Sequence, residues 1–238
     1  MLLEVLDFEP HVRPIAFNAG AQTRVSALLL TPPRASACFV FAHGAGAGMA
    51  HPFMAAVAAG LAERGIASLR YQFPYMERGG KRPDPPKLAH AAVRAAVAEA
   101  RRQLPDVPLI AGGKSFGGRM TSQAQALVPL DGVAGLAFLG FPLHPAKRPS
   151  RERATHLSDV TIPMLFLQGT RDALADLGEL EPVCAALGNR ATLKLFADAD
   201  HSFHVPARTG RKDAEVRAEM LDAFAAWVAR IAGISKRG

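Results

Sequence analysis

Three residues of types that cooperate in nucleophilic catalysis occur along the chain in the order Ser115, Asp172 and His201. A serine hydroxyl is a weak nucleophile until a base removes its proton. A histidine acts as that base when a carboxylate fixes its tautomer and stabilises its charged form. Such a set would attack a carbonyl carbon and carry out acyl transfer. Because the three positions are far apart in sequence, the hypothesis requires a fold that brings them together.

The sequence around Ser115 is typical of a sharp turn between a strand and a helix. Residues 112–118 read GGKSFGG, after an apolar run and before a helix-like stretch. In a G-x-S-x-G turn the serine is strained and its hydroxyl exposed, and small residues such as Gly113 and Gly117 let strand and helix approach closely. An ordinary turn in which the serine caps the helix is the simpler alternative. A phosphate-binding loop is disfavoured because Pro108 stands where its first glycine is required.

The candidate orienting carboxylate, Asp172, and the candidate base, His201, each follow an apolar strand-like run, where open α/β sheets place their ligands. Nearby carboxylates are weaker candidates. Asp176 begins a predicted helix, and Asp198 and Asp200 are so close to His201 in the chain that their carboxylates could not easily approach its ring from behind. A lone histidine is more often a surface or core hydrogen-bonding group than a catalyst. We interpret the remaining histidines in that way: His11, His43, His51, His90, His144, His156 and His204.

A glycine-rich loop, HGAGAG at residues 43–48, follows another apolar run. Acyl transfer places negative charge on the carbonyl oxygen, so backbone N–H donors are needed beside the serine. The amide of Phe116, directly after the candidate nucleophile, is one predicted donor. The amide of Ala45 is the other, with Gly44 as second choice. A flexible connection is the simpler alternative, and a dinucleotide-binding loop is disfavoured because the last glycine of G-x-G-x-x-G is missing.

Apolar runs alternate with helix-like stretches, which predicts an α/β fold with a mostly parallel sheet covered by helices on both faces. Residues 12–17 and 24–30 indicate an antiparallel pair at one edge, joined by a turn at 18–20. No repeat or linker divides the chain, so residues 1–238 are predicted to form one domain. The segment 143–160 is too short for a large cap domain. The other predicted strands are 38–42, 66–69, 109–111, 133–139, 164–167 and 192–196, and the predicted helices are 52–63, 88–104, 117–126, 177–187 and 213–231.

The composition excludes several classes of protein. Of the 238 residues, 49% are hydrophobic and 21% charged, which argues against a disordered or fibrous chain. The net charge of +7 comes mainly from scattered arginines, so no nucleic-acid partner is predicted. Residues 1–10 lack the basic start and apolar run of a signal peptide, and no apolar run would span a bilayer. We therefore expect a cytoplasmic protein with no membrane association.

The two cysteines, Cys38 and Cys184, are far apart and lack metal-ligand spacing. They are interpreted as reduced thiols of a cytoplasmic protein. Nothing in the motifs requires a metal or an organic cofactor, and none is predicted.

These motifs together resemble the α/β-hydrolase superfamily over nearly the whole chain, and within it the small bacterial hydrolases grouped near the dienelactone hydrolases. The resemblance implies an α/β-hydrolase fold and a catalytic triad. Dienelactone hydrolases proper have cysteine at the nucleophile turn, whereas this sequence has Ser115, so lactone hydrolysis is not implied. The segments that carry the resemblance are HGAGAG (43–48), RYQFPYMERGGKRPDPP (70–86), GGKSFGGR (112–119), LQGTRD (167–172) and DADHSF (198–203).

The loop at residues 70–86 is expected to border the substrate pocket. Its apolar side chains would hold an acyl group and its arginines an anionic tail; a solvated basic loop anchored by core aromatics is an equal alternative. We expect hydrolysis of a small-molecule carboxylic ester or thioester. A peptidase, an acyltransferase and a non-catalytic interaction module are the alternatives. The sequence leaves the oligomeric state open, with a homodimer as one possibility. The candidate substrate-binding residues are Arg70, Tyr71, Phe73, Tyr75 and Met76.

Overall fold

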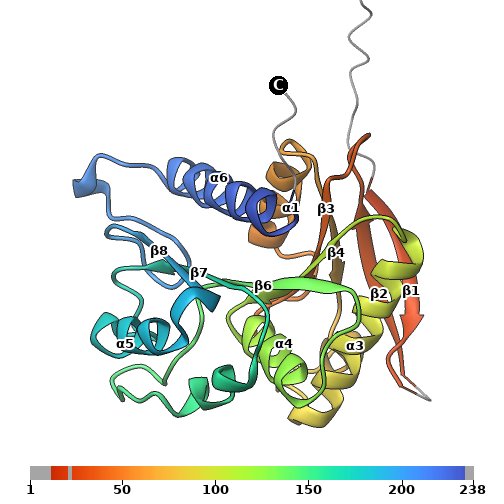
Figure 1. Ribbon diagram of the computed structural model, residues 1–238, viewed down its shortest axis with the longest axis horizontal. Coiled ribbons are helices and arrows are strands. Elements are labelled where there is room, and N and C mark those ends of the chain that lie inside the picture. Colours follow the sequence, from red (N-terminus) through yellow and green to blue (C-terminus); the bar gives the residue numbers. More distant parts are fainter. Residues whose placement is uncertain (1–11, 21–22, 234–238) are drawn as a thin grey trace, which may run out of the picture.

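The computed structural model describes residues 12–20 and 23–233, so the prediction about residues 1–10 lies outside the described residues. An eight-stranded sheet has the order β1-β2-β4-β3-β5-β6-β7-β8 (Figure 1). Strand β2 is antiparallel to its neighbours β1 and β4, and the strands from β4 to β8 pair in parallel. The strands are β1 Val12–Asn18, β2 Arg24–Leu30, β3 Ala37–Ala42, β4 Ile66–Tyr71, β5 Leu109–Lys114, β6 Val133–Leu139, β7 Met164–Gly169 and β8 Ala191–Phe196.

Helices cover both faces of the sheet, as predicted. Figure 1 shows α1 and α6 on one face and α3, α4 and α5 on the other. Between β6 and β7 the only helical element described is a short 3-10 helix, η1, so no large cap domain is evident in the described ranges. The helices are α1 Pro52–Ala62, α2 Pro74–Glu77, α3 Pro86–Gln103, α4 Phe116–Leu127, α5 Leu177–Leu187 and α6 Asp213–Ile231, and the 3-10 helices are η1 Glu152–Asp159, η2 Gly188–Arg190 and η3 Ala207–Thr209.

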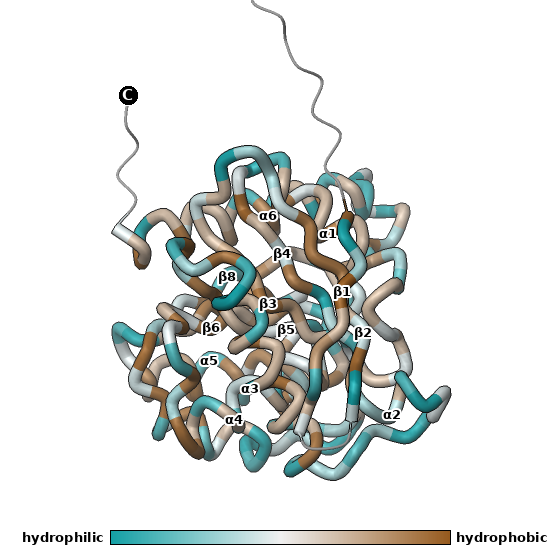
Figure 2. The backbone as a smooth tube through the Cα atoms, turned by 90° about the vertical axis from the view of Figure 1, so that its right-hand side faces the viewer, coloured by the Kyte–Doolittle hydropathy of each residue, from teal (hydrophilic) through white to brown (hydrophobic). Residues whose placement is uncertain are grey.

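The central strands are buried on both faces, which fixes their carboxyl ends in space. Every residue of β3, β4 and β7 is buried, as is usual for parallel strands covered by helices. Phe39 of β3 packs against Phe224 of α6 with ring centroids 4.8 Å apart. On the other face Phe138 and Phe166 pack at 4.9 Å. Figure 2 shows hydrophobic residues along the inner strands and hydrophilic ones mainly in the outer loops.

The predicted strands are observed, with shifted ends where pairing continues. The prediction ends one strand at residue 111, but β5 extends to Lys114, which pairs with Leu139 of β6. Similarly β4 extends to Tyr71, which pairs with Ala42 and Ala27. Neither α2 nor η1 is predicted by the sequence, because such short segments carry little helical periodicity. In the part of the chain that is described, no helix has the length and apolar content needed to cross a membrane.

Candidate active site

Ser115 occupies a strained turn between β5 and α4. Its φ of 50° and ψ of −116° lie outside the regions that most residues adopt, at a cost of about 1–3 kcal/mol. The turn also requires glycine on both sides. A Cβ added at Gly113 would lie 2.4 Å from the carbonyl oxygen of Ala42, and one added at Gly117 would lie 2.6 Å from that same oxygen. The glycines therefore let β5 and α4 approach β3 and present the serine at the edge of the sheet.

The structure brings the three residues of the candidate triad together. The Nε2 atom of His201 lies 2.9 Å from Oγ of Ser115, and its Nδ1 atom lies 2.6 Å from Oδ2 of Asp172. Asp172 follows β7 and His201 follows β8, so two parallel strands deliver them to the edge where β5 ends. The Asp172 side chain is fully buried, whereas that of His201 is 24% exposed. The arrangement allows proton transfer between serine and imidazole while the carboxylate orients the ring.

A buried glutamine, Gln168, holds the carboxylate in place and is missed by the sequence analysis. Its Nε2 atom donates a hydrogen bond to Oδ2 of Asp172, and its Oε1 atom accepts one from the amide of Phe141 at 2.9 Å. The amide of Leu174 donates to Oδ1 of Asp172 at 2.8 Å. The available signal was a polar residue near the end of an otherwise apolar strand. The other carboxylates considered act locally, since Asp176 caps α5 and Asp200 accepts bonds from its own turn.

Lys114, the residue before the nucleophile, fixes the histidine loop. Its Nζ atom donates a 2.6 Å hydrogen bond to the carbonyl oxygen of His201. Burial lowers the pKa of Lys114 from 10.5 to about 8, while the charges of Asp172 and Asp200 act in the opposite direction. The lysine is therefore a positioning residue that links the nucleophile turn to the loop after β8.

Because the pKa of Lys114 is lower in the folded protein, the unfolded chain binds more protons between about pH 8 and 10.5. The unfolding free energy should therefore rise with pH across this window. We expect the free energy of unfolding of wild type, measured relative to that of Lys114→Met, to increase by roughly 3 kcal/mol between pH 7 and 11. Urea denaturation at each pH measures this difference. Lys81→Met, which removes an exposed lysine, is the control, and a difference for Lys114→Met that does not change with pH would contradict the expectation.

The predicted oxyanion donors lie beside the serine. Ala45 and Phe116 line the same cavity as Ser115, and a Cβ added at Gly44 would lie 3.8 Å from Cβ of Ser115. Among the described residues, none of the three backbone N–H groups of Gly44, Ala45 and Phe116 donates a hydrogen bond to the protein. These amides are therefore available to a substrate oxygen.

Side chains from the following segments fix the glycine-rich loop. The amide of Gly46 donates to the Tyr75 hydroxyl at 3.0 Å. His43 is buried and lies 2.7 Å from the Gly44 carbonyl oxygen through Nδ1, while its Nε2 accepts from the amide of Phe73 at 3.1 Å. Burial lowers the pKa of His43 to about 4, so the ring is neutral at pH 7 and donates from Nδ1. The loop is therefore held rigidly rather than being a loose connection.

The residues predicted to bind substrate in the loop 70–86 have a different role, which corrects the expectation. None of Arg70, Tyr71, Phe73, Tyr75 and Met76 lines the cavity beside Ser115. The first four are at most 4% exposed, because β4 extends to Tyr71 and the aromatic rings pack against one another. Arg70 donates to the carbonyl oxygen of Met49. The three aromatic side chains belong to the core, and Phe73 and Tyr75 support the glycine-rich loop through His43 and Gly46.

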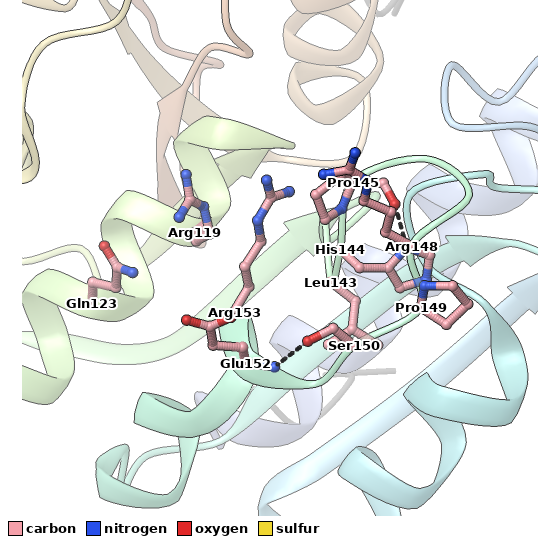
Figure 3. Close-up of a pocket in the computed structure, with 10 residues that line it drawn as sticks. All are labelled: Arg119, Gln123, Leu143, His144, Pro145, Arg148, Pro149, Ser150, Glu152 and Arg153. Carbon is pink, nitrogen blue, oxygen red and sulfur yellow. Dashed lines mark hydrogen bonds between the residues drawn. The ribbon is translucent and has the colours of Figure 1, made fainter.

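Two adjoining cavities lie at this edge of the sheet. The inner cavity, of about 360 Å³, contains the nucleophile. The outer cavity, of about 540 Å³, is drawn in Figure 3. Arg119 and Arg153 line both, so the cavities meet at these two side chains. The inner cavity is lined by Ala45, Pro83, Asp84, Pro86, Ser115, Phe116, Arg119, Met120, Pro142, Arg153 and Leu174. The outer cavity is lined by Arg119, Gln123, Leu143, His144, Pro145, Arg148, Pro149, Ser150, Glu152 and Arg153.

Comparisons with known proteins agree with this architecture. The model of the α/β-hydrolase domain family matches residues 35–229. A dienelactone hydrolase from Anabaena variabilis superposes with a TM-score of 0.74 at 19% identity, covering 94% of this chain and 99% of that one. A serine hydrolase without a lid from Xanthomonas campestris gives 0.70 at 22% identity, covering 92% and 96%. An esterase domain from Rhodothermus marinus gives 0.72 at 17% identity, covering 94% and 100%. At these identities the solved structures establish a shared fold.

Proposed function

The chain belongs to the α/β-hydrolase domain family, and from that premise we propose that it is a serine hydrolase that cleaves a small-molecule carboxylic ester or thioester. The observation that carries the proposal is the continuous contact from Ser115 through His201 to Asp172 at the edge of the inner cavity. The strained turn, the free backbone amides and the buried carboxylate support the same chemistry.

In the first half of the proposed reaction, Oγ of Ser115 bonds to the substrate carbonyl carbon while Nε2 of His201 takes the hydroxyl proton. The carbonyl oxygen becomes an oxyanion that accepts hydrogen bonds from the amides of Phe116 and Ala45. One such donor is typically worth about 10²- to 10³-fold in rate. The bond to the leaving group then breaks, and His201 returns its proton to the departing alkoxide or thiolate. The acid part of the substrate stays esterified to the serine.

In the second half, a water molecule replaces the leaving group. Nε2 of His201 takes a proton from the water, whose oxygen bonds to the acyl carbon. Cleavage of the acyl–Oγ bond releases a carboxylic acid, and the proton on His201 returns to the serine. Throughout, Asp172 stabilises the charged imidazole and keeps Nε2 directed at the reacting atoms. Each turnover consumes one ester and one water and yields one acid and one alcohol or thiol.

Labelling with a fluorophosphonate tests the proposal, because the probe phosphonylates serines activated by a neighbouring base. We expect one adduct per folded chain, located by mass spectrometry on the peptide that contains Ser115. Heat-denatured protein is the control and should not be labelled, since it has lost the serine–histidine contact. An adduct on a different serine, or no adduct on folded protein, would refute the assignment of the nucleophile.

A further inference from the structure

Arg119 is a part of the nucleophile motif that the proposed reaction does not use. It lies in the first turn of α4, where its amide donates a 3.1 Å hydrogen bond to the carbonyl oxygen of Ser115, and both residues line the inner cavity. Its side chain lines both cavities together with Arg153 from η1. Figure 3 shows the Arg119 side chain extending from α4 and the Arg153 side chain extending from η1.

In the described structure, Arg119 and Arg153 lack the counter-ions that Arg78 and Arg151 have. Within the described ranges, no carboxylate forms an ion pair with Arg119 or Arg153, whereas Arg78 pairs with Asp84 and Arg151 pairs with Glu179. The Nε atom of Arg119 is buried without a hydrogen-bond partner in the described structure. A buried N–H of a charged group that stays unpaired is costly, so an added hydrogen-bond acceptor beside Arg119 would be favourable.

The acidic residues of the cavity walls do not neutralise this charge. Asp84 lines the inner cavity, but its Oδ1 accepts from Arg78 and its Oδ2 from the amide of Tyr75, each at 2.7 Å. Glu152 lines the outer cavity without an ion pair to either arginine. The pKa of Arg119 is lowered, first by burial and then by the charge of Arg153. Two cations therefore face one another across a partly desolvated junction.

The positive charge is not shared with the histidine that packs against α4. Burial, and then the charge of Arg119, lower the pKa of His156 to about 4, and the charge of Asp159 opposes this shift. His90 also has a lowered pKa, first because of burial. Both rings are therefore neutral at pH 7, and the fixed charge at the junction belongs to the two arginines.

The wall between the serine and the arginines is mainly apolar. It would accept a short hydrocarbon chain between the two ends. Arginine binds carboxylates through a planar fork that matches their geometry. The apolar side chains of the inner cavity are Ala45, Pro83, Pro86, Phe116, Met120, Pro142 and Leu174.

We propose that Arg119 and Arg153 form an anion subsite at the junction of the two cavities, and that the preferred substrates are monoesters of dicarboxylic acids. The scissile carbonyl lies at Ser115, the methylene chain lies along the apolar wall, and the free carboxylate lies between the two guanidinium groups. This inference rests on the proposed function and specifies its substrate class.

Two esters of equal acyl length test the subsite: monomethyl adipate, which carries a carboxylate, and methyl hexanoate, which does not. Release of acid at constant pH gives kcat/KM for each. For wild type we expect kcat/KM for monomethyl adipate to be at least about tenfold higher than kcat/KM for methyl hexanoate. Arg119→Gln and Arg153→Gln should each lower this ratio about tenfold, the size expected for one charge-assisted hydrogen bond. Arg151→Gln removes the same charge from the same segment but lies outside both linings, so it should leave the ratio unchanged.

A wild-type ratio near or below one would overturn the subsite, and so would a fall with Arg151→Gln equal to that with Arg119→Gln, because a general positive field would then explain the preference. Hydrolysis of neither ester would count against the proposed function instead. In that case calorimetric titration with adipate decides the subsite separately. Binding to wild type and Arg151→Gln that is lost in Arg119→Gln supports it, and no binding to wild type refutes it. Thermal unfolding verifies that each variant is folded.

Discussion

Replacing Ser115 with alanine is expected to lower kcat for ester hydrolysis by at least about 10⁴-fold, because the remaining residues cannot form an acyl-enzyme. The fold should survive. The strain at Ser115 lies in the backbone, which is held by β5, α4 and the neighbouring glycines, and alanine removes only the hydroxyl. Steady-state kinetics with a chromogenic ester measures the loss, and thermal unfolding verifies the fold. The hydrogen bond to His201 disappears, but the ring remains held through Asp172.

The chain offers a matched control on the same helix. Ser122 also contacts a histidine, with its Oγ 2.7 Å from Nε2 of His156, and it donates to the carbonyl oxygen of Arg119. This pair is a poor nucleophile and base, because Ser122 lines neither cavity and no carboxylate accepts a hydrogen bond from His156 in the described structure. Ser122→Ala should keep kcat within about threefold of wild type, because the Ser122 side chain lies outside both cavities and takes no part in the proposed reaction. Full activity in Ser115→Ala together with a loss of activity in Ser122→Ala would mean that Ser122, and not Ser115, is the nucleophile.

The sequence predicts where the three residues of the candidate triad meet, because topology determines it. A parallel sheet brings the carboxyl ends of its strands to one edge, and the residues that follow β5, β7 and β8 include Ser115, Asp172 and His201. Each strand is identified by a mostly apolar run, which is interrupted by Lys194 in β8. Chain order and strand ends therefore suffice to bring together residues that are far apart in sequence, and no side-chain detail is needed.

The contacts that refine the site depend on side-chain packing, which no local pattern specifies. Gln168 supports Asp172 only because β7 and the loop after β6 are neighbours, so that its amide reaches Phe141 as well. The sequence places the aromatic residues of the loop 70–86 at the pocket, but they are core residues, because β4 extends to Tyr71 and the rings of Phe73 and Tyr75 pack on from it. Arg119 becomes notable only when its buried Nε atom is found to be unpaired.

His201→Ala is expected to lower kcat by about 10⁴-fold, because the base, the acid for the leaving group and the base for the water are then all lost. The backbone around position 201 should not change, since the contact to Lys114 uses the carbonyl oxygen of that residue. The double variant Ser115→Ala/His201→Ala should be no slower than Ser115→Ala alone, because residues that act as a unit are not additive. Independent roles for the two residues would instead make their effects multiply.

A nearby histidine separates catalysis from loss of structure. His204 lies in the same loop, bonds to Asp213 through Nδ1 and is 62% exposed. His204→Ala should keep kcat within about threefold, because the change affects a surface pair worth little to the fold. A loss of less than tenfold in His201→Ala would mean that another group removes the serine proton. An equal loss in both variants would mean that the loop after β8, rather than the imidazole of His201, is what the reaction requires.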